Sequence, residues 1–555
     1  KSNRSPILHG NRTVDTEARS IESRSSYPGR SDFNPSKVWA NTGEETLARI
    51  RMVSWFNQKS AESIVLQDRK GRMLEWQRKQ DVYGEALTAE TRKRTAYRRI
   101  GRNPKVIREE LSGAMQPMGT MPGRKFFFSS SMLEEILDIR NVQRALRQVT
   151  ANKGAGGVDG MQSDELRDYL NTYWQTLRAD ILTGNYRPQA VRKVEIPKAG
   201  GGKRLLGIPT VVDRVIQQAI AQWLSPKYEG EFSPHSYGFR PNRNAHQAVQ
   251  KAQDYLNGGY TRVVELDLDK FFDRVNHDKL MGLLCVKIKD KRTLKLIRSY
   301  LNSGILENGL ISPRTEGTPQ GSPLSPLLSN IMLHELDQEL ENRGLRFVRY
   351  ADDCSIYVGS RKSAARVMAG ITNYLEDRMK LKVNREKSKV SYASKSTLLG
   401  FSFYRTVNGW KIRIAPKSLT RIKEKIREQT RRNKPVTLKV RIIKLEEIIR
   451  GWVNYFCLAE ARKHMAELDK WTRTRLRITL WKQWKTSSCR IRNLIRLGVT
   501  KAKAYQLANT RKSYCRTAHS PTLLTTLNNS HFTGLGLVGF QNYYYWKTTH
   551  QTKLF

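Results

Sequence analysis

The spacing of apolar positions predicts a folded region that begins near residue 129. In SMLEEILDIRNVQRALRQV (131–149), apolar residues recur every three or four positions, which predicts a helix. In VRKVEIPKAGGGKRLLGIPT (191–210), two apolar-rich runs flank a cluster of glycines, which predicts a β-hairpin. Helical spacing returns in DRVIQQAIAQWLSPKY (213–228). The start of the folded region therefore mixes helices and strands.

Three later segments have the pattern of strands. TRVVELDLDKFFDRVNH (261–277) predicts a buried strand that ends in carboxylates. FVRYADDCSIYVGS (347–360) predicts a strand, a turn and a second strand, and STLLGFSFYRTVNGWKIRI (396–414) predicts another hairpin. Together these segments predict a layered α+β fold up to about residue 415.

Both ends of the chain differ from this middle part. Beyond Pro416 the pattern becomes helical and very basic, as in SLTRIKEKIREQTRRNK and WTRTRLRITLWKQWK, which predicts an all-helical appendage. Residues 1–128 are polar, basic and only weakly periodic. We expect them to form a partly disordered extension and assign them no chemistry.

The net charge points to a polyanionic partner. Lys and Arg number 99 against 51 Asp and Glu, a formal charge of +48. Such an excess repels itself unless a phosphate backbone neutralises it, so nucleic acid is favoured, while acidic lipid stays open for single patches. Five cysteines without a CxxC pair favour a reducing, cytoplasmic setting, with an organellar origin left open. Neither an apolar run of about 18 residues nor a secretory signal is present, so no membrane partner is expected.

Carboxylates follow two of the predicted strands. Asp267 ends the apolar run of VVELDLD, and Asp352 and Asp353 stand side by side in YADD. Carboxylates that converge at strand ends are suited to hard divalent cations, above all Mg²⁺. Two such ions about 3.5–4 Å apart can stabilise both oxygens of an in-line phosphoryl displacement. Asp is also a common turn residue, and for YADD alone the turn and the metal site are about equally favoured.

The order of motifs distinguishes these alternatives. From Met132 to Phe555 the chain resembles the reverse transcriptases encoded by group II introns, also called intron maturases. The motifs that carry the resemblance are, in order, KGAGGVDGM, IPKAGGGKRLLGIPTVVDRVIQQAI, SYGFRPNRNAHQA, VVELDLDKFFDRVNH, GTPQGSPLSPLLSNIMLHELD, FVRYADD, LKVNREKSKV, LLGF and RGWVNYF.

The resemblance implies a right-hand polymerase fold. Fingers and palm would occupy residues 129–415, the thumb or maturase domain X residues 416–486, and a small DNA-binding region residues 487–555. Many members end in an HNH endonuclease that needs paired cysteines. Cys489 and Cys515 are too few and too far apart for two CxxC pairs, so the endonuclease-less type is predicted.

The resemblance also implies roles for individual residues of the active site. Asp267, Leu268, Asp352 and Asp353 would be the metal-binding positions, with Asp353 in an assisting role. Lys387 would lie near the leaving pyrophosphate as a general acid, with nearby Lys389 as the alternative.

Nucleotide recognition is assigned to four other positions. Phe272 would exclude a ribose 2′-hydroxyl, with a core role as the alternative. Lys198 and Arg204 flank the glycine hairpin and would bind the triphosphate, as a point charge and a planar fork can. Gln320 would contact the incoming nucleotide. Arg240 supports either template or fold, and its role is left open.

Basic side chains beside Trp and Tyr in the helical appendage suit RNA binding. A merely solvated helix face would have more interspersed acidic residues. The predicted RNA-binding residues are Arg431, Arg432, Lys439, Arg441, Arg473, Arg475 and Arg477.

The predicted function is RNA-directed DNA polymerase and maturase. Its partners would be group II intron RNA, a DNA target and primer, and dNTPs, with two Mg²⁺ ions as cofactors and Mn²⁺ as a substitute. It would assist splicing and copy the intron by target-primed reverse transcription. Two alternatives are a splicing factor with a decayed polymerase and a domesticated reverse transcriptase in defence or repair. The oligomeric state is open, with a dimer among the alternatives.

Overall fold

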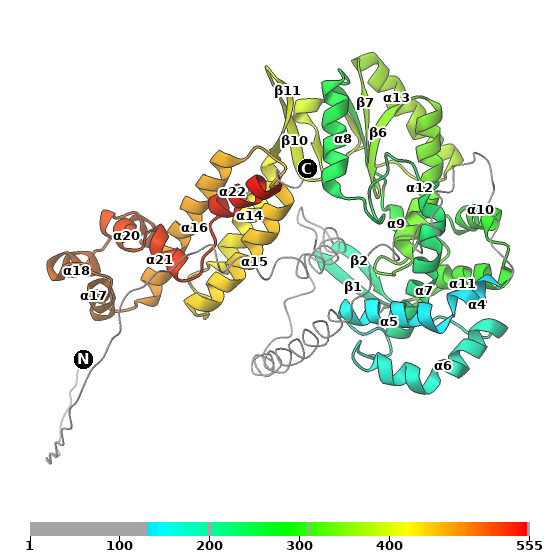
Figure 1. The fold of residues 1–555 in the computed structure, drawn as a ribbon, viewed down its shortest axis with the longest axis horizontal. Coiled ribbons are helices and arrows are strands. Elements are labelled where there is room, and N and C mark those ends of the chain that lie inside the picture. The colour runs from blue at the N-terminus through cyan, green and yellow to red at the C-terminus, as the bar shows by residue number, and fades with distance from the viewer. Residues whose placement is uncertain (1–130, 198–202, 308–309, 552–555) are drawn as a thin grey trace, which may run out of the picture. The chain divides into compact units, whose positions relative to one another are not determined.

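A computed structural model describes residues 131–197, 203–307 and 310–551 (Figure 1). The predicted extension at residues 1–128 lies outside these ranges, and so does Lys198. Within them, the first part of the chain mixes helices and strands and the last part is helical. This confirms the predicted α+β fold followed by an all-helical region.

The region that precedes the second sheet is mostly helical, and it contributes two strands to a first sheet that two later strands complete. The expected helix over 131–149 is in fact two helices, α4 and α5, since the Asp138 side chain accepts a hydrogen bond from the backbone N–H of Arg140 and starts the second one. The glycine hairpin has its predicted strands, β1 and β2, which pair antiparallel. The bounds are α4 Met132–Ile136, α5 Ile139–Ala151, α6 Leu166–Thr183, β1 Val191–Pro197, β2 Lys203–Ile208, α7 Val211–Glu229, β4 Ile305–Glu307 and β5 Leu310–Ser312.

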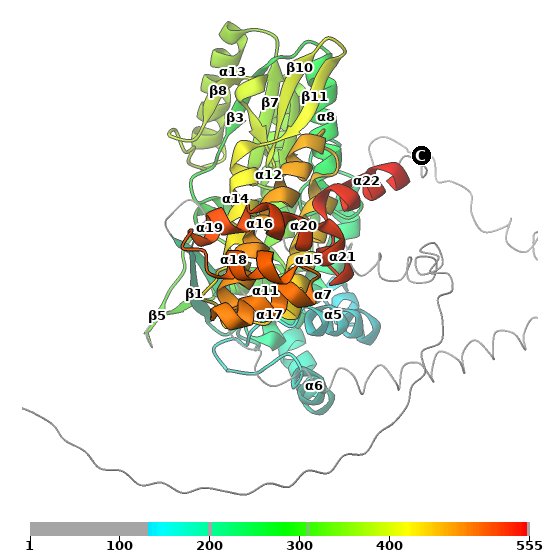
Figure 2. The same cartoon turned by 90° about the vertical axis from the view of Figure 1, so that its left-hand side faces the viewer.

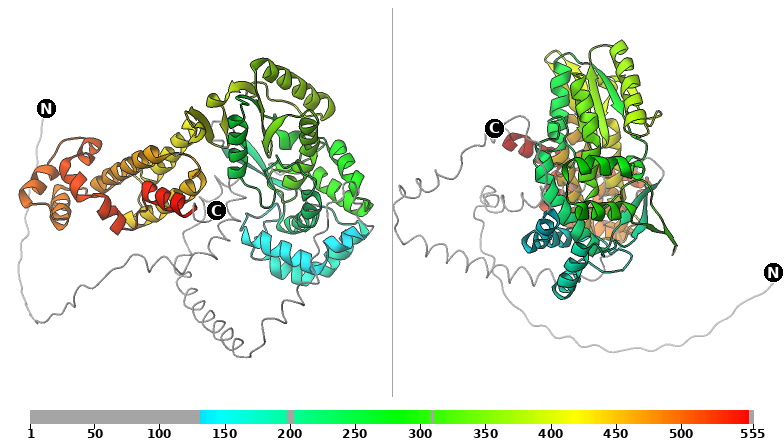
Figure 3. Two further views of the ribbon diagram at one scale, coloured as in Figure 1. Left: turned by 45° about the horizontal axis from the view of Figure 1, so that its top comes forward. Right: turned by 90° about the vertical axis from the view of Figure 1, so that its right-hand side faces the viewer.

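A second, four-stranded sheet, which we call the central sheet, is antiparallel and has the order β6-β7-β3-β8. Its strands contribute to core on both faces: Val264 and Ile356 pack into one apolar cluster, and their neighbours Val263 and Tyr357 into another. Helices α12 and α13 cover the first face and α8 covers the second (Figure 2; Figure 3). The bounds are α8 Ala245–Asn257, β3 Arg262–Leu266, α9 Phe271–Arg274, α10 His277–Lys287, α11 Lys291–Asn302, α12 Ser325–Asn342, β6 Arg346–Tyr350, β7 Asp353–Val358, α13 Arg361–Asn373, a π-helical turn Tyr374–Arg378 and β8 Lys389–Tyr392.

The second apolar cluster continues from the central sheet into the helical region. Phe401 of the hairpin after the sheet contacts the rings of Tyr455 and Phe456, and the Tyr455 hydroxyl donates to the carbonyl of Leu399 at 2.8 Å. Among the described residues no helix is long and apolar enough to cross a bilayer. The bounds are β9 Thr397–Leu398, β10 Phe401–Thr406, β11 Gly409–Ile414, α14 Pro416–Gln429, α15 Leu438–Phe456, α16 Arg462–Gln483, α17 Ser487–Arg496, α18 Lys501–Ala508, α19 Tyr514–Ala518, α20 Pro521–Thr526, α21 Asn529–Gly534 and α22 Phe540–Gln551.

Candidate active site

The YADD motif forms a two-residue hairpin turn between β6 and β7. Tyr350 pairs with Asp353, so Ala351 and Asp352 are the two turn residues. Ala351 has φ of 56°, and hairpin turns that match the twist of their strands require a positive φ at this first central position. The turn therefore presents Asp352 at its tip and Asp353 at the first position of β7.

Strand β3 brings Asp267 to the same end of the sheet. Leu266, the last residue of β3, lies opposite Cys354 of β7. Because the two strands are antiparallel, the next residue of β3 lies alongside the residue before Cys354, so Asp267 is placed alongside Asp353. The register thus places the backbone positions of the three aspartates at the same end of the sheet.

The backbone and side chain of Asp267 are both held by the segment 384–388. Its N–H donates to Ser388 Oγ at 3.0 Å, and its carbonyl accepts from the Asn384 N–H at 2.8 Å. Lys387 Nζ lies 3.2 Å from the Asp267 carboxylate, whereas Lys389 pairs instead with Glu265. Lys387 is thus the lysine that faces the site. Asn384 and Ser388 were missed at the sequence level, although both stand in the quoted motif LKVNREKSKV.

The donor set fits a hard cation by its chemistry. Asp267, Asp352 and Asp353 offer oxygens only, and Leu268 could add only its backbone carbonyl because its side chain is a hydrocarbon without donor atoms. The bridge between Leu268 and Val383 uses hydrogen bonds of Asp267 and Asp269, not of Leu268. Within the described ranges, no three His, Cys, Asp or Glu side chains are gathered closely enough to form a metal cluster. The metal ligands stay a prediction.

Three of the predicted nucleotide-binding residues, Gln320, Phe272 and Arg204, lie in the described ranges, and each is tied to a neighbouring segment through its backbone. Gln320 accepts a hydrogen bond through its backbone carbonyl from the N–H of Gly207 in β2, at 3.0 Å. Phe272 is half-buried and its carbonyl accepts from the Thr318 N–H at 2.6 Å, while Phe271 is 3% exposed. Phe271 is therefore the core residue of the pair. The backbone of Arg204 pairs with Ile196 across the glycine hairpin.

Arg240, whose role was left open, supports the fold. It is 3% exposed and its guanidinium donates to both carboxylate oxygens of Glu229 at 2.8–3.2 Å. It also donates to the carbonyls of Ser233 and Ser236. Because these hydrogen bonds go to Glu229 at the end of α7 and to two carbonyls after it, the side chain holds the loop that follows α7 in place.

The predicted RNA-binding residues divide by exposure. Arg431, Arg432 and Lys439 are exposed at the α14–α15 connection. Arg441 and Arg477 are instead 1% and 5% exposed; Arg441 donates to the carbonyls of Gln429, Lys434 and Val436, and Arg477 to that of Leu527.

Burial also lowers the pKa of both guanidinium groups, since desolvation disfavours their charge. These placements argue against RNA contacts by Arg441 and Arg477 and correct that part of the prediction.

Arg475 is half-buried, and its guanidinium donates to the side-chain hydroxyl and to the backbone carbonyl of Thr430. Arg473 is half-buried near Asp469.

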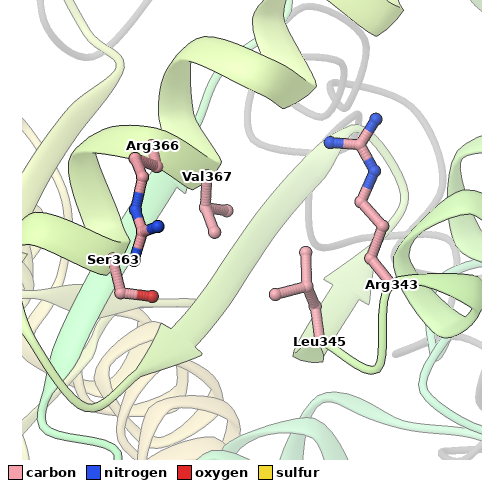
Figure 4. A pocket seen from close by; sticks show the side chains of 5 residues that line it. All are labelled: Arg343, Leu345, Ser363, Arg366 and Val367. Carbon is pink, nitrogen blue, oxygen red and sulfur yellow. The ribbon is translucent and has the colours of Figure 1, made fainter.

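A cavity of about 280 Å³ lies away from the aspartates, between the end of α12, the start of β6 and α13. Figure 4 shows Arg343 and Leu345 on one side and Ser363, Arg366 and Val367 on the other. None of the predicted site residues lines it.

Two family models match this chain. Residues 196–403 match "Reverse transcriptase (RNA-dependent DNA polymerase)", and residues 419–498 match "Group II intron, maturase-specific domain". The first match contains all three aspartates and the strands that carry them. The second begins in α14 and ends just after α17.

Three curated relatives are similar to this chain. Protein YkfC of Escherichia coli K12 is 34% identical over 45% of this chain and 76% of that protein. The group II intron-encoded protein LtrA of Lactococcus lactis subsp. cremoris is 30% identical over 46% of this chain and 54% of that protein. The putative COX1/OXI3 intron 2 protein of Saccharomyces cerevisiae is 29% identical over 52% of this chain and 39% of its own length.

The chain thus spans three quarters of YkfC but only about half or less of the two intron proteins. A solved "Partial Cas6-RT-Cas1--Cas2 complex" aligns at 24% identity over 44% of this chain and 43% of that chain; its TM-score of 0.30 is too low to support a functional comparison. The two family models, taken with YkfC and LtrA, identify the chain as a member of the group II intron-encoded reverse transcriptase and maturase family.

Proposed function

We propose that this protein is an RNA-directed DNA polymerase and maturase that binds group II intron RNA, assists its splicing and copies it into cDNA at a DNA target. The observation that carries the proposal is the strand register that places Asp267 alongside the YADD turn, within a segment that matches the reverse transcriptase model. The primer would be a 3′-hydroxyl at the target and the substrates would be dNTPs.

The aspartates would bind the divalent ions of this reaction. Asp267 and Asp352 would hold two Mg²⁺ ions, with Asp353 assisting, Leu268 contributing a backbone carbonyl, and Mn²⁺ as a substitute. When bound, such ions stabilise charge on the attacking and leaving oxygens of a phosphoryl transfer. Ser388 and Asn384 fix the backbone of Asp267, which would keep its carboxylate oriented.

Other side chains would bind the incoming nucleotide. Lys198 and Arg204 would contact the triphosphate, and Gln320, whose backbone is tied to β2, would contact the nucleotide itself. Phe272 would act as the steric gate against a 2′-hydroxyl, a role supported by its neighbour Phe271 being the more buried ring. Lys387, held at Asp267, would donate a proton to the leaving pyrophosphate.

The helical region would bind RNA by charge and stacking. The candidates are the exposed Arg431, Arg432 and Lys439, followed by the half-buried Arg473 and Arg475. Arg432 lies over the ring of Tyr514, at 4.9 Å from its centroid, which would let an unpaired base stack nearby. Residues 487–555 would contact the DNA target.

Primer extension on an RNA template, with dNTPs and Mg²⁺, tests the polymerase. We expect long cDNA from the unaltered chain and a loss of about 10³-fold or more in Asp352→Asn, because several kcal/mol of charge stabilisation are removed. Asp168→Asn removes one exposed carboxylate on α6 and should leave the rate unchanged. If neither the chain nor the control extends a primer but both bind RNA tightly, the polymerase proposal is wrong and a splicing cofactor remains.

A further inference from the structure

A fully buried ion pair lies directly beneath the YADD turn. The guanidinium of Arg349, in β6, donates from Nε and Nη2 to the two carboxylate oxygens of Asp337, in α12, at 2.6 and 2.5 Å. Both side chains are 0% exposed. The pair is therefore bidentate and wholly removed from water.

Stability alone is a weak reason for such a pair. Removing two charges from water costs several kcal/mol per ion, and apolar residues of similar size often serve as well or better. The remaining nitrogen of Arg349 indicates what the pair does. Arg349 Nη1 donates to the carbonyl of Ala351 at 3.0 Å and to Oδ1 of Asn330 at 3.1 Å. The ion pair thus fixes the Nη1 donor of Arg349 against the carbonyl of Ala351, the turn residue that precedes Asp352.

The same turn is held from its other side by the segment around Gly238. Asn330 Nδ2 donates to the Gly238 carbonyl at 2.9 Å, and a Cβ on Gly238 would lie 2.2 Å from the backbone nitrogen of Ala351. The backbone of Arg349 pairs with His235 and Tyr237 at 2.9 Å each. Ala351, with its positive φ, is thereby enclosed between α12 and this segment.

We infer that Arg349 is a positioning residue that, together with Asp337 and Asn330, sets the location of the Asp352 carboxylate for the reaction. It touches no substrate and acts through the carbonyl of Ala351. Reacting groups misplaced by about 1 Å can cost about 100-fold in rate, so a turn held by one guanidinium can control turnover without binding RNA. This inference rests on the proposed polymerase function.

The test separates fold from position with a paired replacement. In Arg349→Met/Asp337→Val the charges leave together, so we expect the variant to fold with unchanged RNA affinity and a modestly lower melting temperature, since Asn330 and the Ala351 carbonyl lose a donor. Turnover should fall by about 100-fold and the Mg²⁺ concentration for half-maximal rate should rise. Arg349→Lys keeps a charge for Asp337 but cannot donate to Asp337 and Ala351 in the same fork, and it should show the same loss.

A matched control removes a second Arg–carboxylate pair whose carboxylate also lies on α12. Arg343 and Glu339 are 2.6 Å apart but partly exposed, and Arg343→Met/Glu339→Val should keep normal turnover and Mg²⁺ dependence. The inference is overturned if the Arg349/Asp337 double variant matches the unaltered chain in turnover and in Mg²⁺ dependence. If the double variant fails to fold, the same comparison is made with Arg349→Lys.

Hydrogen–deuterium exchange across residues 347–358 gives a reading that does not need activity. Exchange should speed up in the Arg349 variants and not in the control, and unchanged exchange overturns the inference even if the unaltered chain extends no primer. An inactive unaltered chain with faster exchange in the Arg349 variants would instead contradict the polymerase proposal and leave the support of the turn intact.

Discussion

At the scale of single residues, the site depends on which charged side chain faces which carboxylate. Lys387 and Lys389 are two positions apart, yet one lies 3.2 Å from Asp267 and the other 3.3 Å from Glu265. Sequence alone left both as candidates for the general acid. The two lysines can be compared directly in mutants, since both are exposed and each contacts a carboxylate at or just after the end of β3.

We expect Lys387→Met to lower the rate of nucleotide addition by about 100-fold, the lower end of what a general acid contributes. The Mg²⁺ concentration for half-maximal rate should not rise, because a cation that competes for Asp267 has been removed. Single-nucleotide incorporation under pre-steady-state conditions measures both quantities. Lys389→Met is the control, and an equal loss in that variant would show that the lysine at 387 has no special role.

At the scale of elements, strands and hairpins were predictable because alternation and turn residues are local. The turn at Ala351 and Asp352 and the end of β3 at Leu266 follow from the sequence pattern alone. The partner of Arg349 was not predictable. Asp337 lies 12 positions earlier on a helix, and only the packing of α12 on the sheet brings them together. The break between α4 and α5 was missed because the apolar spacing continues across it.

Arg441 is another residue whose partners could not be predicted from the sequence, and it gives a prediction for the connection between α14 and α15. Its charge suggested a surface residue, but its guanidinium bonds three backbone carbonyls of that connection. We expect Arg441→Met to lower the free energy of unfolding by about 3 kcal/mol, since three partly buried carbonyls lose their donor. Urea unfolding followed by tryptophan fluorescence measures this. Arg432→Gln, at an exposed position, should change it by no more than about 0.5 kcal/mol; a similar loss in both would refute the structural role.

At the scale of the whole molecule, the formal charge of +48 predicts strongly salt-dependent RNA binding but not where RNA binds. The described structure narrows the location, because it removes Arg441 and Arg477 from the surface and leaves Arg431, Arg432 and Lys439 exposed together. Other exposed cations, such as Arg361, Lys362 and Arg366 on α13, contribute equally to the net charge. Comparing variants of these two groups of three cations therefore distinguishes a local RNA contact from the effect of overall charge.

Each phosphate contact contributes about 0.7 to 0.9 to the slope of log affinity against log salt concentration. If the exposed group at the α14–α15 connection contacts RNA, changing Arg431, Arg432 and Lys439 to Gln should reduce that slope by about 2 to 3. Changing Arg361, Lys362 and Arg366 to Gln removes the same charge and should leave the slope nearly unchanged. Fluorescence anisotropy of a labelled intron RNA across a salt series measures both. Equal reductions in the two triple variants would mean that RNA responds to the field of the whole protein, and that the helical region offers no particular binding surface.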